Sequence, residues 1–147
     1  MQYFYLKPDL RQLTALAEQG NAEAQYELGF KYHQGDGVQQ NLPQASYWYQ
    51  KSAQQGYASA QVNLGALYHK GFGVKKNALK ARRWYRKSAK QGNSNAQYNL
   101  GQLYRIGVGL PQDLERAKKW YRKAAAKGHS AAKQVLRDLV KNLEVIA

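Results

Sequence analysis

The chain has 147 residues and no cysteine, which excludes a disulfide framework, a catalytic thiolate and cysteine-ligated zinc. Its formal net charge of +14 lies entirely in the second half, since residues 1–73 carry five Lys or Arg and five Asp or Glu, whereas residues 74–147 carry eighteen and four. No apolar run approaches the roughly 20 residues of a membrane span, and the opening residues lack a signal-peptide pattern. We therefore expect a soluble, cytoplasmic protein, and leave a periplasmic or secreted mature form open.

A pair of helices is predicted from the apolar residues of the first half. Ala24, Leu28 and Tyr32 recur at helical spacing before a glycine pair, which predicts helix A and its C-terminal cap. Asn41 then precedes a second apolar stripe that ends before Gly56, which predicts helix B with an N-terminal cap. One such pair cannot bury both stripes alone, so we expect copies of it to stack.

The same residue types return at intervals of 36 residues, as in the columns Gly20/Gly56/Gly92/Gly128, Ala24/Ala60/Ala96/Ala132, Leu28/Leu64/Leu100/Leu136, Gly29/Gly65/Gly101 and Tyr49/Tyr85/Tyr121. We predict a single domain over residues 1–147, with an N-terminal capping helix in 1–21, repeats at 22–57, 58–93 and 94–129, and a C-terminal capping helix in 130–147. The first helix is expected over residues 8–19, with Leu13, Leu16 and Ala17 on its apolar side. The last is expected to expose a polar outer face through Lys133, Arg137, Asp138 and Lys141.

The pattern Ala-x-x-x-Leu-Gly-x-x-Tyr-x-x-Gly-x-Gly-Val, then Ala-x-x-Trp-Tyr-x-x-Ala, then Gly, resembles the Sel-one-like repeat family over residues 22–129. The third copy departs from it by Leu110 in place of Val and by Pro111 in the loop. The resemblance implies an all-α fold related to tetratricopeptide repeats: a right-handed α-α superhelix, or solenoid, of 36-residue helix-turn-helix repeats, with helix A on the concave side and helix B on the convex side.

The resemblance also implies a role. Members of the family are mostly adaptors and assembly scaffolds, and many bacterial ones are exported or act in host contact or in competition between bacteria. Cysteine-rich relatives with β-lactam binding carry a disulfide in each repeat. That activity is not carried over, because this chain has no cysteine.

Features that could indicate catalysis or metal binding have simpler explanations. The Gly-x-Gly segments follow helices and lack the Lys-Ser/Thr of a phosphate-binding loop, which favours helix C-caps. His33 and His69 share one repeat position, but no third ligand accompanies them, so we expect them to complement the negative helix end as cations. His129 is read as a loop residue. We expect no enzyme activity, no metal and no cofactor, since no nucleophile and base recur at contact spacing.

Function is expected where the copies differ and the side chains lie off the apolar stripe. On helix A these positions form a row of aromatic and amide side chains, with Val62 between two tyrosines. Rings supply contact area and amides bind a peptide backbone, which favours capture of a peptide or loop. Packing between repeats is the alternative for Tyr26 and Tyr98. The predicted partner-binding residues are Tyr26, Glu27, Phe30, Asn63, Tyr98, Asn99 and Gln102.

On helix B, the outward columns are basic in the second and third copies only. The predicted basic patch is Arg82, Arg83, Arg86, Lys87, Lys118, Lys119, Arg122 and Lys123. Like charges in neighbouring repeats repel each other, so a ligand of opposite charge would explain the patch. A solvated surface is the alternative, because salt screens isolated surface charges.

These surfaces favour a non-catalytic protein-protein interaction module with an acidic protein partner, such as a small bacterial adaptor or an immunity protein that inhibits its partner. The alternative is a polyanion, either nucleic acid or an anionic membrane surface, bound by helix B of repeats two and three. Trp84 and Tyr85 are expected to be used in packing, which would leave the patch without a stacking platform for bases and favours a protein. The oligomeric state is left open.

Overall fold

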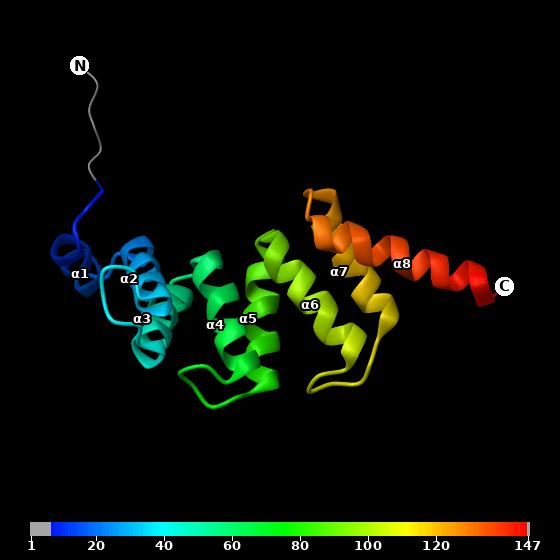
Figure 1. Ribbon diagram of the computed structural model, residues 1–147, viewed down its shortest axis with the longest axis horizontal. Helices are drawn as coiled ribbons and strands as arrows, with labels where there is room; N and C mark the ends of the chain where they lie inside the picture. The colour runs from blue at the N-terminus through cyan, green and yellow to red at the C-terminus, as the bar shows by residue number, and fades with distance from the viewer. Residues whose placement is uncertain (1–6, 147) are drawn as a thin grey trace, which may run out of the picture.

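The computed structural model describes residues 7–146, and in this range the chain forms eight α-helices and no strand. The helices follow one another along a solenoid with α1 and α8 at opposite ends (Figure 1). Each helix packs chiefly against the helix before it and the helix after it, so the predicted all-α solenoid is confirmed. The bounds are α1 Leu10–Glu18, α2 Ala22–Gln34, α3 Leu42–Gln54, α4 Ala58–Lys70, α5 Ala78–Lys90, α6 Ser94–Ile106, α7 Leu114–Ala126 and α8 Ser130–Ile146.

Local capping explains where the helices begin and end. The Asn21 Oδ1 accepts a hydrogen bond from the Ala24 N–H at 2.8 Å, and Asn41 caps α3 in the same way. The helices A of the repeats, α2, α4 and α6, end at glycines with φ between 71° and 80°, a conformation that favours glycine. The Gly-x-Gly segments are therefore C-caps, as their position after a helix predicts.

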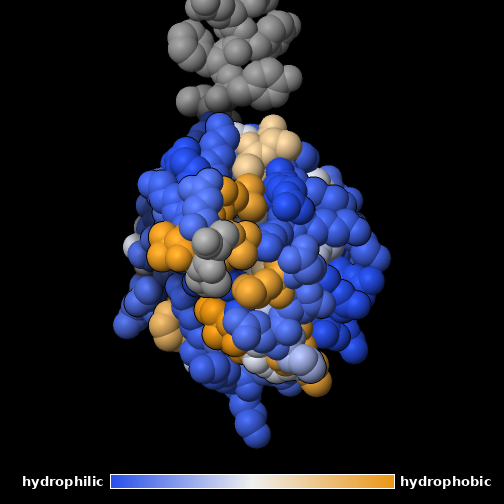
Figure 2. Space-filling view, turned by 90° about the vertical axis from the view of Figure 1, so that its right-hand side faces the viewer, coloured by the Kyte–Doolittle hydropathy of each residue, from blue (hydrophilic) through white to orange (hydrophobic). Residues whose placement is uncertain are grey.

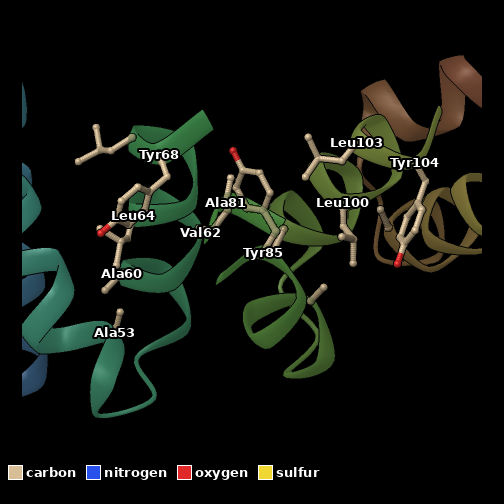
Figure 3. Packing of buried hydrophobic residues seen from close by; sticks show 14 of the residues in the cluster. Ala53, Ala60, Val62, Leu64, Tyr68, Ala81, Tyr85, Leu100, Leu103 and Tyr104 are labelled. Carbon is tan, nitrogen blue, oxygen red and sulfur yellow. The ribbon is translucent and has the colours of Figure 1, made fainter. Parts of the chain in front are cut away.

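A glycine and a tyrosine set the distance between the two helices of each repeat. Tyr85 on α5 is 2% exposed, and a Cβ added to Gly65 on α4 would lie 2.7 Å from its ring. Gly29 faces Tyr49 and Gly101 faces Tyr121 in the same manner. Figure 3 shows Tyr85 in a continuous layer of buried side chains that extends from α4 to α6. Only glycine at this position lets the two backbones approach so closely.

Buried glutamines link successive repeats. Gln25 is 4% exposed, and its Nε2 donates to the Ala17 carbonyl at 3.1 Å while its Oε1 accepts from the Gln55 Nε2 at 2.8 Å. Gln61 and Gln91 form the same pair one repeat later. A buried amide that is satisfied at both ends stabilises the junction and fixes its geometry.

The third junction differs, because Lys127 occupies the position of Gln55 and Gln91. The Lys127 Nζ donates to the Gly92 carbonyl, and the buried Gln97 Oε1 has no hydrogen-bond partner within the described part of the chain. A buried carbonyl oxygen without a donor lowers stability. We therefore expect the third junction to contribute less stability than the first two.

The two ends of the solenoid differ from what the sequence predicts. On α1, Leu13 and Ala17 are buried as expected, but Leu16 is 40% exposed. On α8, the four predicted polar residues are exposed, but Val140 and Leu143 are also 55% and 57% exposed. The prediction of a polar outer face on α8 is therefore wrong in part. Within residues 7–146, no neighbouring helix covers these side chains as one does at the same positions of the inner repeats.

Two turn glycines provide a matched test of the packing between repeats. Gly37 and Gly73 hold equivalent positions with φ of 71° and 70°, but a Cβ at Gly37 would meet nothing within 4 Å, whereas one at Gly73 would lie 2.4 Å from the Leu42 carbonyl carbon. We expect Gly37→Ala to lower the free energy of unfolding by about 1 kcal/mol through backbone strain. Gly73→Ala should lower it by about 1–3 kcal/mol more, because the turn must move away from α3. Denaturant unfolding measures both losses, and equal losses would contradict this packing.

The unpartnered Gln97 gives a second prediction. Lys127→Gln should restore the amide pair of the inner junctions and raise the free energy of unfolding by about 1 kcal/mol. Lys119→Gln, at an exposed position on α7, whose C-cap is Lys127, is the control for the loss of one positive charge. Thermal and denaturant unfolding of the three proteins measure the effect. If the two variants were stabilised equally, the gain would come from charge and not from the amide.

Candidate partner-binding surfaces

The predicted helix A residues divide into two groups. Tyr26, Glu27 and Phe30 come together in a hollow of about 340 Å³ beside the middle and C-terminal part of α2, near the N-terminal end of the solenoid. Glu27 is exposed, Phe30 is 43% exposed and Tyr26 is half-buried. The remaining walls of the hollow are Lys7, Pro8, Lys31 and Asp36, and the last two form an ion pair at 3.1 Å. This hollow offers aromatic area beside a carboxylate.

Tyr26 also packs between repeats. Its ring centroid lies 5.2 Å from that of Tyr57, the N-cap residue of α4, and 5.9 Å from that of Tyr49. On the other side it lies 6.3 Å from the ring of Phe30. Tyr26 therefore has the packing role that was the alternative, and it also forms part of the hollow floor.

The predicted residues of α4 and α6 lie outside this hollow and are half-buried. Val62 is 7% exposed, so the prediction of an exposed valine in the row is wrong: the side chain joins the main core. Tyr98 contacts the Tyr121 ring at 5.8 Å, and its hydroxyl accepts from the Gln102 Nε2 at 3.0 Å. The Tyr121 hydroxyl donates to the Gln102 Oε1. Tyr98 and Gln102 are thus held in a packed network, while Asn63 and Asn99 keep partial exposure.

His129 has a larger role than that of a loop residue. Its ring stacks on Tyr98 with centroids 4.7 Å apart and planes 20° apart. Its Nδ1 accepts from the Ala132 N–H at 3.2 Å and caps α8, so the Nε2–H donates to the Asn95 Oδ1 at 3.1 Å. The sequence does hold a signal for this stack: His129 lies two periods after Tyr57, and Tyr98 two periods after Tyr26.

His33 and His69 are not suited to the cationic role that their position predicts. Burial and the charge of Lys70 lower the pKa of His33, and burial, Lys76 and Lys70 lower the pKa of His69. The Tyr49 hydroxyl, whose pKa is raised by burial, lies 3.3 Å from the His33 Nδ1. A neutral imidazole and a protonated hydroxyl share this hydrogen bond. The prediction that His33 and His69 are cations at the C-terminal end of helix A is therefore wrong at neutral pH.

The basic patch forms a surface along α5 and α7, called the basic face below. On α5, four of its residues line a hollow of about 570 Å³ together with Leu79 and Lys90. On α7, Lys118 is half-buried and forms an ion pair with Glu115 at 3.1 Å. Three ion pairs occur in the described range, and this is the one that involves the basic face. The exposed cations of the face are Arg83, Arg86, Lys87, Lys119, Arg122 and Lys123.

Tryptophan side chains lie beneath two of these lysines. The Lys87 Nζ lies 4.9 Å from the ring centroid of Trp84, and the Lys123 Nζ lies 4.8 Å from that of Trp120. Both rings are half-buried. The prediction that Trp84 serves only in packing is therefore wrong in part, whereas Tyr85 is buried as expected. Cation–π contacts hold the two ammonium groups above the rings. The rings are therefore covered by cations.

Residues 7–146 provide neither a membrane-spanning helix nor a cluster of metal ligands. No helix there combines the length and apolar character needed to span a lipid bilayer. No cluster of three His, Asp or Glu side chains there is arranged to bind a metal ion.

The two histidines predict a dependence of stability on pH. Their folded-state pKa values are lowered from 6.5, so the stability they contribute is present above pH 6.5 and is lost as the pH falls, because the unfolded chain binds the protons first. We expect the double variant His33→Gln, His69→Gln to lose less stability than the unmodified chain between neutral pH and about pH 5. Denaturant unfolding at a series of pH values measures the difference, and parallel curves would contradict neutral histidines.

Known proteins resemble this chain along most of its length. The Sel1 repeat model matches residues 22–57, 58–93 and 94–129. A Sel1 repeat protein of Oxalobacter formigenes is 42% identical, with a TM-score of 0.79, and the match covers 88% of this chain and 98% of that one. A protective antigen of uropathogenic Escherichia coli with the same repeat fold is 40% identical, with a TM-score of 0.81, over 83% of this chain and 26% of the antigen.

A shorter match involves the secretory immunoglobulin A-binding protein EsiB of Escherichia coli O6:H1, which is 43% identical over 44 residues. That segment is 30% of this chain and 9% of EsiB, so the chain spans a small part of that protein's length. Sel1 repeat proteins generally act as scaffolds for protein-protein interactions. With three consecutive repeats that cover residues 22–129, the chain belongs to the Sel1 repeat family.

Proposed function

We propose that this chain is a non-catalytic interaction module that binds one acidic protein, with the basic face as its main contact surface. The observation that carries the proposal is the set of six exposed cations on α5 and α7 that have no carboxylate partner within residues 7–146. Like charges on the helices B of neighbouring repeats repel each other, and an acidic surface would remove that cost on binding. The bound protein would be an adaptor's client or the target of an inhibitor.

The distribution of charge supports one specific partner over a uniform scaffold role. The equivalent positions in the first repeat are Ser46, Tyr47, Gln50 and Lys51, so the face is basic over two repeats only. Charge complementarity of this kind sets association rate and selects among partners.

The hollow on α2 supplies a second contact. Phe30 and Tyr26 present aromatic area, and Glu27 beside them is an acceptor for a backbone N–H or a cation of the partner. Asn63 and Asn99 continue the same helix A positions with partly exposed amides. Tyr98 and Gln102 are proposed to support this surface through their internal contacts.

A polyanion is the competing ligand for the basic face. Bases of single-stranded nucleic acid bind by stacking on open aromatic rings. Here Lys87 and Lys123 lie over the two tryptophans, which favours charge-based contact with a folded acidic surface. Duplex nucleic acid and anionic vesicles are therefore the controls in the test.

The test is affinity capture from a native, nuclease-treated lysate at physiological salt. We expect one acidic protein to be enriched by the unmodified chain and by Lys75→Glu, Lys76→Glu, which changes two exposed cations of the loop between α4 and α5, outside the basic face. The variant Arg86→Glu, Arg122→Glu has the same change in charge and should reduce capture by about tenfold or more, because repulsion replaces attraction on the contact surface. Glu27→Ala, Phe30→Ala should weaken capture to a smaller extent.

Direct binding to duplex DNA and to anionic vesicles separates the two ligand classes. If the polyanion is the ligand, affinity for arbitrary duplex falls steeply with salt and is lost in Arg86→Glu, Arg122→Glu, while no acidic protein is enriched. Capture of the acidic protein that survives both the basic-face and the hollow variants would overturn the assignment of these surfaces.

A further inference from the structure

The outer face of α8 matches a helix A that lacks its helix B within the described residues. Leu136 and Val140 hold the positions of Leu28 and Tyr32. In the inner repeats these positions belong to the apolar stripe of helix A that faces helix B. Leu28 is 1% exposed, whereas Leu136 is half-buried and Val140 is 55% exposed. Ala132, on the side toward α7, is fully buried. One side of α8 is therefore packed as in a repeat, and the other side is free in the described structure.

A hollow of about 440 Å³ lies along this free side, lined by Leu136, Arg137, Val140, Lys141 and Glu144. Figure 2 looks onto this end of the molecule and shows apolar side chains gathered among polar ones. In an inner repeat, the position of Arg137 is that of Gly29, which faces the ring of Tyr49 on helix B. The hollow is thus the place that a following helix B would occupy.

The opposite end carries the complementary feature. α1 holds the helix B positions of a repeat without a helix A before it in the described range: Leu13 corresponds to Tyr49, and Leu16 to Ser52. Ser52 is fully buried and its Oγ donates to the Ala22 carbonyl of its own helix A at 2.6 Å, whereas Leu16 is 40% exposed. Leu13 and Leu16 line a hollow of about 250 Å³ together with Glu23 and Glu27.

We propose that these two ends bind each other in different copies of the chain. α8 of one copy takes the place of helix A against α1 of the next copy, and the solenoid continues across the contact with the geometry of its inner repeats. The occupant of the α8 hollow is therefore a second copy of this chain.

The exposure of the α1 side chains shows which of them a second copy can reach. Leu13, at the tyrosine position, is 1% exposed and packs in a buried cluster with Ala24 and Leu28 of α2. Leu16 is 40% exposed, so it is the apolar side chain through which α1 can contact α8 of a second copy.

Charge supports this pairing. The α8 hollow carries Arg137 and Lys141 beside one carboxylate, and the α1 hollow carries Glu23 and Glu27. Association of α8 with α8 of another copy would instead place the two cations against their own counterparts. Because α8 and α1 are different surfaces, every assembly keeps one free α8 end and one free α1 end. Further chains can therefore add at either end, and the assembly lengthens as concentration rises.

Sedimentation equilibrium of the full chain at a series of concentrations tests the proposal. The mean mass of the unmodified chain should rise with concentration. Val140→Asp blocks the α8 end and Leu16→Asp blocks the α1 end, and each alone should weaken self-association by about tenfold or more, because a charge would be buried without a partner. Leu79→Asp, at a 60% exposed position on α5, is the matched control and should associate as the unmodified chain does.

Mixing the two blocked variants is the decisive experiment. Val140→Asp retains a functional α1 end and Leu16→Asp retains a functional α8 end, so an equimolar mixture should form one-to-one dimers and nothing larger. Self-association of either variant at the level of the unmodified chain would overturn the proposal, because it would show contact between like ends. A constant monomer mass of the unmodified chain would overturn it too. Thermal unfolding checks that each variant folds, and Leu16→Gln replaces Leu16→Asp if the latter unfolds early.

Discussion

The contact between a glycine of helix A and a tyrosine ring of helix B governs the rest of this molecule. It occurs in each of the three repeats, and the ring lies too close to the glycine for any side chain there. The short separation of the two helices places small residues such as Ala45 and Ala81 in full burial. It also fixes the orientation of the two helices in each repeat, and with it the direction of their outward side chains. Equivalent positions of successive repeats therefore lie at regular intervals along the solenoid.

This constraint separates the residues that build the solenoid from those free to vary. The glycine, alanine and tyrosine columns serve packing, and the paired glutamines also donate hydrogen bonds to backbone carbonyls of the preceding repeat. What remains are the outward positions of helix B and a few positions of helix A. The first repeat fills the outward positions with neutral side chains and one lysine, and the next two fill them with arginine and lysine. These differences in charge between copies thus lie on the outside, where a ligand could respond to them.

The sequence predicts the helices well because the determinants are local. Caps such as Asn21 and Asn41, C-terminal glycines and a 36-residue period act within one repeat and need no knowledge of its neighbours. Side-chain environments are predicted less well because they depend on which helix packs alongside. Val62 lies in the same column as Tyr26 and Tyr98 but is buried. Its small branched side chain fits inside the junction between repeats, where the larger tyrosine side chain stays partly exposed. The stack of His129 on Tyr98 and the neutral state of His33 depend in the same way on residues one helix away.

The linear order of the helices gives the uneven charge a spatial meaning. In a compact globule, residues from both halves of the chain intermingle, and an excess of charge in one half is spread over the whole surface. Along this solenoid, position in sequence is position along the long axis (Figure 1), so the neutral first half and the second half with its excess of +14 lie at different ends. The molecule therefore carries an electric dipole moment along its length. In the field of an acidic surface it experiences a torque that turns repeats two and three toward that surface before contact is made.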